Sequence, residues 1–356
     1  MCEYLSIDGE RLAPDTLAQW RQGKSGIAAE LADFLADWYS PPPTMELHTS
    51  GSTGKPSVMY AAKEAMRAGA RLSCEIFGLR HGSRALLCLP LRYIAGKMMV
   101  VRALVSGCEL VLCDPCSMPL AKLTEPVDFA PLVPMQAVTT LQQSNGAEQL
   151  ARARTLLLGG GFIDPALETD LQGVNSHIYA SYGMTETLSH IALRRVNGPD
   201  RSDLYSPLPG VTVSLSPDSA LIISAPHLNI QRLVTHDIAE LAADGRFRIL
   251  GRQGAVINSG GVKIQAEEVE QALRAATRLN LLVLPMPDRV LGQCVALLWE
   301  GPAAAEATLQ RAISELPAYH RPRLIRHVAE LPRTATGKLD RAAATARLHE
   351  DAGKTS

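Results

Sequence analysis

A short segment that combines glycines, hydroxyl side chains and one lysine carries the clearest chemical signal in this chain. It runs from His48 to Ser57 and reads HTSGSTGKPS. Glycine allows positive φ and a close approach of the backbone to a ligand, so N–H groups can converge on phosphate oxygens while hydroxyls and a lysine add donors and charge. The pattern predicts a phosphate-binding loop, although solvated turns use the same residue types. The residues expected to hold phosphate are Thr49, Ser50, Gly51, Ser52, Thr53, Gly54 and Lys55.

The spacing of this segment differs from that of a Walker A loop. A Walker A loop has a glycine five positions before its Gly-Lys pair and Ser or Thr directly after the lysine. Here Thr49 and Pro56 stand at those two places. The segment is therefore not a Walker A loop.

Two polar segments follow apolar runs that read as buried strands. Gly159-Gly160-Gly161 follows the run 155–158, and Tyr182-Gly183-Met184-Thr185-Glu186 follows the run 178–180. Ligands of α/β proteins bind beyond the carboxyl ends of strands. The glycines could form a flat floor there, Tyr182 could stack a base, and Glu186 could hold Mg²⁺ together with phosphate oxygens. Taken singly, the glycines also fit a plain tight turn and Glu186 a surface helix.

Three later features contain polar residues that packing does not require. Asp237, in Thr235-His236-Asp237, could accept hydrogen bonds from both hydroxyls of a ribose, the role of the acid in dinucleotide folds. Arg252 could contact ribose or phosphate. Lys338 closes the basic segment 333–338 and could neutralise charge that develops on a phosphoryl group, although a solvated tail explains that segment almost as well.

The elements that must position these residues alternate between apolar runs and helical patterns. The runs 85–89, 109–113 and 155–158 read as buried strands and 63–77 as a helix, which favours an α/β fold with a largely parallel sheet. The first forty residues look helical and mixed. After Tyr205 short strand candidates suggest a small antiparallel subdomain, and a fresh αβ pattern begins near Gln253. We therefore predict a large N-terminal domain over 1–252 and a small, mobile α+β C-terminal domain over 253–356.

Composition narrows the function classes. A formal net charge of −1 at pH 7 argues against nucleic-acid binding. No apolar run approaches the eighteen or so residues of a membrane span, and the first residues lack the pattern of a secretory signal. The seven cysteines are odd in number and lie mostly in apolar runs, as expected for reduced thiols in the cytoplasm. Cys113-Asp114-Pro115-Cys116 lacks a second ligand pair and reads as a strand leading into a turn.

Taken together and in this order, the segments resemble the signatures of the acyl-adenylate-forming superfamily. The resemblance runs from about Glu46 to Arg341. It implies ATP, Mg²⁺ and coenzyme A as ligands, a small-molecule acid as substrate, and a C-terminal domain that rotates between two half-reactions; it leaves room for a homodimer. The implied catalytic residues are Lys338, Thr185 and Glu186, with Glu186 also the metal ligand. The implied nucleotide contacts are Thr49 to Lys55, Gly160, Gly161, Tyr182, Asp237 and Arg252, and the implied coenzyme A contacts are Gly260, Gly261 and Lys263.

Within the superfamily, the stretch 89–99 (LPLRYIAGKMM) and the compact length resemble short o-succinylbenzoate–CoA ligases of menaquinone biosynthesis. That resemblance implies an aromatic dicarboxylate, so a polar group must meet the carboxylate that does not react. The candidates are Arg92, Ser189 and His190, with Arg194 and Arg195 as competitors, and Tyr93 stands at a position expected to gate the acyl pocket.

Three departures from the superfamily pattern keep alternatives open. Ser57 replaces a lysine, His236 replaces the glycine of Thr-Gly-Asp, and Gly254 stands where the domain hinge has Asp or Lys. The alternatives are another aryl- or fatty-acid–CoA ligase, and a degenerate nucleotide-binding paralogue without activity. Lys338 and Asp237, retained together with Glu186, favour an enzyme.

Overall fold

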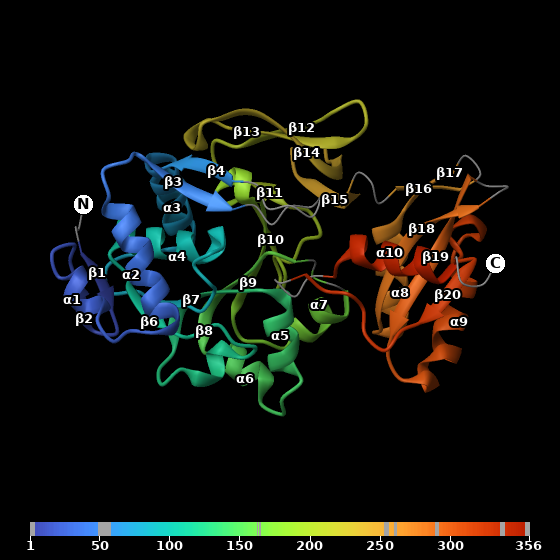
Figure 1. Cartoon of the computed structure of the whole chain (residues 1–356), viewed down its shortest axis with the longest axis horizontal. Helices are drawn as coiled ribbons and strands as arrows, with labels where there is room; N and C mark the ends of the chain where they lie inside the picture. The colour runs from blue at the N-terminus through green and yellow to red at the C-terminus, as the bar shows by residue number, and fades with distance from the viewer. Residues whose placement is uncertain are drawn as a thin grey trace.

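The computed structural model describes residues 4–48, 58–161, 163, 165–252, 256–259, 262–288, 292–334 and 339–352. Within these ranges the chain is an α/β protein with one large, mostly parallel sheet, a small antiparallel sheet, a β-hairpin and a separate C-terminal sheet. Figure 1 shows the C-terminal sheet beyond β15, at the far end of the long axis from the N-terminus. The predicted fold class is confirmed.

The large sheet has nine strands in the order β11-β10-β9-β8-β7-β5-β6-β1-β2. The strands from β1 through β6, β5, β7 and β8 to β9 are parallel, and the two edges are antiparallel. Their bounds are β1 Leu5–Ile7, β2 Glu10–Leu12, β5 Arg84–Leu87, β6 Glu109–Leu112, β7 Val127–Leu132, β8 Ala153–Leu158, β9 His177–Gly183, β10 His190–Arg195 and β11 Ser206–Pro207. Three of the predicted buried runs, 85–89, 109–113 and 155–158, are thus strands of this sheet.

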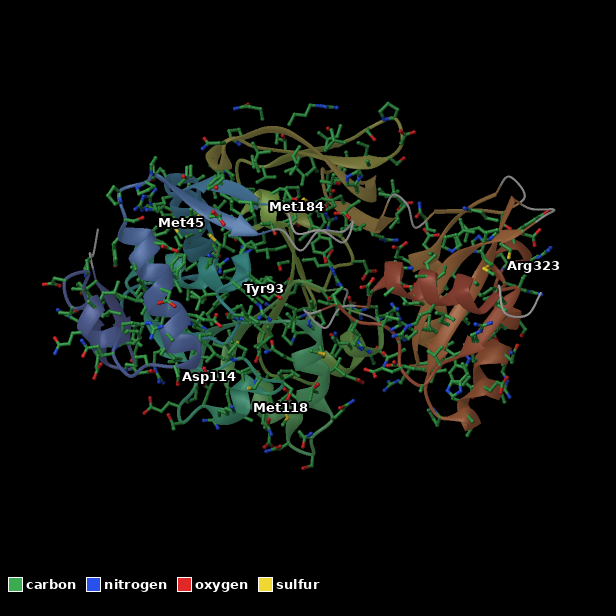
Figure 2. The ribbon with its side chains drawn as sticks, viewed as in Figure 1. Met45, Tyr93, Asp114, Met118, Met184 and Arg323 are labelled. Atoms are coloured by element: carbon green, nitrogen blue, oxygen red, sulfur yellow. The ribbon has the colours of Figure 1, made fainter. Side chains whose placement is uncertain are left out.

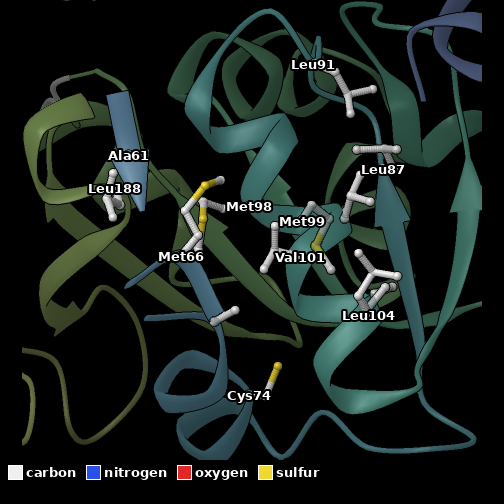
Figure 3. Packing of buried hydrophobic residues seen from close by; sticks show 14 of the residues in the cluster. Ala61, Met66, Cys74, Leu87, Leu91, Met98, Met99, Val101, Leu104 and Leu188 are labelled. Carbon is white, nitrogen blue, oxygen red and sulfur yellow. The ribbon is translucent and has the colours of Figure 1, made fainter. Parts of the chain in front are cut away.

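Helices cover both faces of the large sheet, because parallel strands are apolar on both sides. One apolar cluster joins the sheet to α2 Gly26–Tyr39, α3 Lys63–Phe77 and α4 Ile94–Ser106. Figure 3 shows part of it, with Met66 of α3 near Met98 of α4. The other cluster joins the sheet to α5 Pro134–Leu141, α6 Gly146–Leu150 and α7 Pro165–Leu171.

The start of the chain is less helical than its sequence suggested. β1 and β2 form a hairpin whose first strand joins the sheet beside β6, and only then follow α1 Leu17–Arg21 and α2. The turn after β6 fits its prediction, because Asp114 accepts a 2.7 Å hydrogen bond from the backbone N of Ile27 in the first turn of α2. The cysteines at 113 and 116 therefore flank a structural turn.

Two antiparallel units stand beside the large sheet. β3 Thr44–His48 and β4 Val58–Ala62 form a hairpin in which His48 pairs with Val58. The predicted phosphate loop is the connection between these strands and lies outside the described residues. The four-stranded sheet β12-β13-β14-β15 contains β12 Thr212–Leu215, β13 Ala220–Ala225, β14 Ile230–Leu241 and β15 Phe247–Arg252. The predicted antiparallel subdomain is confirmed.

The C-terminal residues form a five-stranded sheet with helices on both faces. β16 Val256–Ser259, β17 Val262–Gln265, β18 Asn280–Asp288, β19 Gly292–Glu300 and β20 Leu324–His327 are its strands. Its helices are α8 Ala266–Thr277, α9 Glu306–Glu315 and α10 Arg341–Ala352. Two apolar clusters of its own, one under α8 and α9 and one under α10, give this sheet a separate core. In the described parts of the chain, no helix is long and apolar enough to span a membrane.

Candidate active site

The predicted glycine floor lies beside the end of β9. β8 and β9 are adjacent parallel strands, with Leu158 opposite Ala180, so 159–161 and 182–186 leave the same edge of the sheet. Gly160 has φ of +73°, a conformation that favours glycine. A side chain at Gly159 would meet the hydroxyl of Ser181 at 2.5 Å. The backbone at this edge therefore carries no side chains, which leaves room for a planar ring to lie against it.

Tyr182 links this edge to the antiparallel sheet. Its hydroxyl donates a 2.7 Å hydrogen bond to Oδ2 of Asp237, and its ring lies against Phe247 with centroids 5.3 Å apart. Asp237 of β14 is buried and stands opposite Arg252 of β15 in the strand register. Residues that are 55 and 70 positions away from Tyr182 thus meet at one place. The structure describes the backbone of Arg252 but not its side chain.

The Thr185–Glu186 segment forms a tight turn, η2 Thr185–Thr187. Thr187 is fully buried, and its hydroxyl accepts a 2.9 Å hydrogen bond from the backbone N of Met184. A side chain at Gly183 would collide with the backbone of Ser189 and His190, so the turn is pressed against the start of β10. Met184, marked in Figure 2, begins this turn. The carboxylate of Glu186 is thereby held at the exposed edge of the site.

This carboxylate fits the way Mg²⁺ binds with nucleotides. Within the described ranges, no three His, Cys, Asp or Glu side chains gather into a metal-binding group. Mg²⁺ needs no such cage, since it is commonly held by one or two carboxylates and substrate phosphates. Exposed Glu186, in a segment that leaves the same edge of the sheet as the glycine floor, suits that arrangement.

A buried polar cluster lies directly behind the turn. Arg102 of α4 donates from Nε to the Ser73 hydroxyl of α3 at 2.8 Å and from Nη2 to the Ser189 hydroxyl at 3.0 Å. The Ser189 hydroxyl also lies 3.3 Å from Nδ1 of His190. Arg102 is 3% exposed and His190 8%. We call Ser73, Arg102, Ser189 and His190 the Arg102 cluster.

The Arg102 cluster holds a positive charge without an evident counter-ion. Among the described residues, no carboxylate lies within ion-pair distance of Arg102 and His190 Nε2 is buried without a hydrogen-bond partner. Burial lowers the pKa of Arg102 to about 10, which leaves it charged at neutral pH. Burial and the nearby Arg102 lower the pKa of His190 to about 3, which leaves it neutral. A buried, uncompensated charge is costly, so the cluster suits an anionic ligand.

The other predicted substrate contacts are placed differently. Arg92 is exposed, with its guanidinium 4.9 Å from the ring centroid of Tyr93, which Figure 2 marks at the turn before α4. Of the two competitors, Arg194 forms an ion pair with buried Glu168, and Arg195 donates to the carbonyl of Asn197 at 2.9 Å. The structure brings Ser189 and His190 to a buried cation, and that cation is Arg102.

Sequence reasoning missed Arg102, although the sequence contains a signal for it. It is the one charged residue in the otherwise apolar stretch 98–105, where a helix would bury every face. A lone arginine in such a stretch needs a buried partner.

Several predicted contacts lie outside the described residues: Thr49 to Lys55, Gly260, Gly261 and Lys338, together with the departures Ser57 and Gly254. Lys263 is described through its backbone in β17, where it pairs with Asn258. The roles assigned to these residues stay predictions.

The mostly parallel sheet, the bare backbone at the ends of β8 and β9 and the separate C-terminal sheet are the fold of an adenylate-forming enzyme. Residues 40–221 match the family described as AMP-binding enzyme, so the chain belongs to that family. The resemblance predicted from the motifs is confirmed.

Individual curated relatives support this family assignment. The curated 2-succinylbenzoate–CoA ligase of Lactococcus lactis is 27% identical over 312 residues, covering 82% of this chain and 68% of its own length. That of Haemophilus influenzae is 27% identical over 307 residues, covering 82% and 65%. The chain thus spans about two thirds of the length of these relatives.

Solved structures show the same fold. An acyl-CoA synthetase (AMP-forming)/AMP-acid ligase II-like protein from Dyadobacter fermentans is 33% identical, covers 93% of this chain and 97% of its own, and has a TM-score of 0.62. The Bacillus subtilis o-succinylbenzoate CoA synthetase in complex with its acyl-adenylate intermediate is 23% identical, covers 84% and 68%, and has a TM-score of 0.72.

Proposed function

We propose that this chain is an AMP-forming carboxylate–CoA ligase that converts o-succinylbenzoate, ATP and coenzyme A to o-succinylbenzoyl-CoA, AMP and diphosphate. In the first half-reaction a carboxylate oxygen attacks the α-phosphorus of ATP, and diphosphate leaves. In the second, the thiol sulfur of coenzyme A attacks the acyl carbon, AMP leaves and the thiol proton is released. Membership of the AMP-binding family and the curated relatives support the reaction class.

The observation that favours a dicarboxylate is the Arg102 cluster. A monocarboxylic acid reacts through its only carboxylate, so a buried cation elsewhere in the acyl pocket would have no partner. A second carboxylate would neutralise Arg102 through a charge-assisted hydrogen bond and could also accept hydrogen bonds from Ser189. The cluster adjoins the Thr185–Glu186 turn through Ser189, three residues further along the chain.

The roles of the nucleotide contacts follow from their positions. Gly160, Gly161 and Tyr182 would frame adenine, and Asp237 with Arg252 would hold the ribose. Mg²⁺ bound by Glu186 and phosphate oxygens would neutralise charge on the departing diphosphate. Thr53 and Lys55 would grip the β and γ phosphates, and Lys338 would lie against the reacting carboxylate.

The C-terminal sheet is proposed as the mobile domain. Its separate core, formed by residues from Ile257 to Leu348, supports a boundary between 252 and 253. Rotation about that boundary would withdraw Lys338 and bring Gly260, Gly261 and Lys263 to coenzyme A, a hinge closure. We further propose a cytoplasmic enzyme; sedimentation of the purified chain would decide whether it is the homodimer that the motifs leave room for.

The deciding experiment measures AMP release from Mg·ATP with o-succinylbenzoate, benzoate or octanoate, each with and without coenzyme A. We expect turnover with o-succinylbenzoate at least about a hundredfold faster than with the two monocarboxylates, since a buried charge left unpaired costs several kcal/mol. Faster turnover with benzoate or octanoate would favour the other ligases. No turnover with any acid would favour the degenerate paralogue.

A further inference from the structure

A polar pocket opens at the edge of the large sheet where β7, β8 and β9 begin, opposite the edge that carries the glycine floor. It has a volume of about 630 Å³ and is lined by the first residues of β7, β8 and β9 and by the segment after β10. β8 and β9 are six and seven residues long, so the two sites lie about 20 Å apart along the strands. We call this the strand-start pocket; its charged residues are Asp128, Arg152, Arg154, His177 and Arg195.

The strand-start pocket is strongly basic. Three arginines, Arg152, Arg154 and Arg195, face a single carboxylate, that of Asp128, among the described residues that line it. Asp128 already accepts a 2.9 Å hydrogen bond from the backbone N of Arg84. If His177 is counted as neutral, the lining carries a formal charge of +2. No other described residue of the lining carries a negative charge that would offset it.

One of these arginines also has an orphaned donor. Nε of Arg152 is buried and has no hydrogen-bond partner among the described residues. A buried guanidinium N–H left unpaired carries a desolvation cost. Arg152 also lines the pocket, so an anion there would offset the charge of its guanidinium, whereas an apolar ligand could not.

The walls of the pocket are held in place by the side chains of buried Asn197 and half-buried Ser176. Asn197 donates to the carbonyl oxygens of Val174 at 3.1 Å and Ser176 at 2.9 Å, and its Oδ1 accepts from the N of Ile178 at 3.1 Å. The Ser176 hydroxyl donates to the carbonyl of Ala153 at 2.7 Å. The loop before β9 is thus tied to β8 and to the end of β10. A preformed pocket binds without the cost of ordering its walls.

We propose that the strand-start pocket binds the phosphate group of a small phosphate monoester, at a site separate from the ligase site. A phosphate monoester carries close to two negative charges at pH 7, which matches the formal charge of the lining. Guanidinium groups form paired hydrogen bonds with phosphate oxygens. The volume lies within the range of small-molecule sites.

Isothermal titration calorimetry of the full chain with ribose 5-phosphate tests this proposal, with ribose as the uncharged comparison. We expect binding of ribose 5-phosphate alone, weakened at least about tenfold in the Arg152→Gln/Arg154→Gln double variant, because two charge-assisted hydrogen bonds are lost. Arg232→Gln, which removes an exposed arginine of β14, should leave the affinity unchanged. Asp128→Asn should strengthen binding, since it removes the opposing charge and keeps an acceptor for Arg84.

The outcomes separate this pocket from the glycine-rich loop. If ribose 5-phosphate bound at 49–55 instead, its affinity would be the same in the wild type and in the double variant. That result would overturn the proposal, and so would the absence of any binding. If the double variant does not fold, by circular dichroism and thermal midpoint, Arg154→Gln alone carries the test. Its exposed side chain can be changed without a packing cost, and unchanged affinity would likewise refute the site. None of these measurements depends on ligase activity.

Discussion

The hydroxyl of Tyr182 donates a 2.7 Å hydrogen bond to Oδ2 of Asp237 and so ties the end of β9 in the large sheet to β14 in the antiparallel sheet. Asp237 is buried, which makes each hydrogen bond to its carboxylate valuable. The bond fixes the aromatic ring proposed for adenine relative to the carboxylate proposed for ribose.

Tyr182→Phe should therefore weaken both stability and nucleotide binding. The ring keeps its contact with Phe247, but the buried carboxylate loses a donor, at a cost of about 1–3 kcal/mol in the free energy of unfolding. We expect a higher KM for ATP with a smaller change in kcat. Urea unfolding and steady-state kinetics measure the two effects. Tyr60→Phe is the matched control, because the exposed Tyr60 hydroxyl donates to Glu46 at 3.3 Å; equal, small effects of both variants would contradict the prediction.

Gly183→Ala should disrupt the Thr185–Glu186 turn. A methyl group at Gly183 would meet backbone atoms of Ser189 and His190, which cannot swing aside as side chains can. Overpacking of this kind costs about 1–3 kcal/mol, and AMP release should fall because Glu186 moves. Gly173→Ala provides the control, since nothing lies within 4 Å of the added methyl group. Thermal unfolding midpoints of the two variants that differ by less than a degree would show that the turn tolerates the methyl group.

The sequence predicted the large elements well because their patterns are strong and local. The helix predicted over 63–77 is α3 Lys63–Phe77. β1 was missed because it has three residues, too few to show a periodicity. β14 was missed because polar side chains such as Gln231, Arg232 and His236 interrupt it; its partners on both sides define it as a strand.

In the candidate site too, some residues could be predicted from local patterns and others could not. Tyr182 and Asp237 could be predicted as site residues because each belongs to a short motif, and the structure adds the hydrogen bond between them. Arg102 belongs to no motif: its partners Ser73 and Ser189 lie 29 residues before it and 87 after it. Packing of α3 and α4 against β10 brings the three together, which no local pattern could reveal.

Arg102→Met should change the choice of acid more than the fold. Replacing a buried, uncompensated charge by an apolar side chain of similar length is commonly tolerated. We expect kcat/KM for o-succinylbenzoate to fall on the order of 100-fold, while turnover of benzoate stays within about threefold. Arg92→Met is the comparison, because Arg92 is the exposed rival. A larger loss in Arg92→Met, or an equal loss with both acids in Arg102→Met, would remove Arg102 from the proposed role.

The buried His190 should make stability depend on pH. Its folded pKa of about 3 lies below the unfolded value of about 6.5. Between these values the unfolded chain binds the extra proton, so stability is lost as the pH falls below about 6.5, by up to about 1.4 kcal/mol per pH unit. His190→Gln should remove this component.

Urea unfolding of the wild type and His190→Gln at pH 7, 6 and 5 measures it. The difference between the two proteins should narrow toward low pH. His81→Gln, at an exposed histidine, should leave the pH dependence of the wild type unchanged. Parallel curves for the wild type and His190→Gln would show that His190 titrates normally in the folded state.

Lys338→Ala should separate the two half-reactions. Lys338 is proposed to stabilise charge between the substrate carboxylate and the α-phosphate, and loss of one such group commonly costs a hundredfold to a thousandfold in rate. Adenylation, followed by diphosphate release, should fall by about that factor. Thioester formation from a supplied o-succinylbenzoyl-adenylate and coenzyme A should stay within about threefold, because the proposed domain rotation would carry Lys338 away from the reacting groups. Lys122→Ala, at an exposed lysine of the large domain, should affect neither step, and an equal loss of both steps in Lys338→Ala would mean that the lysine supports the fold or the domain orientation instead.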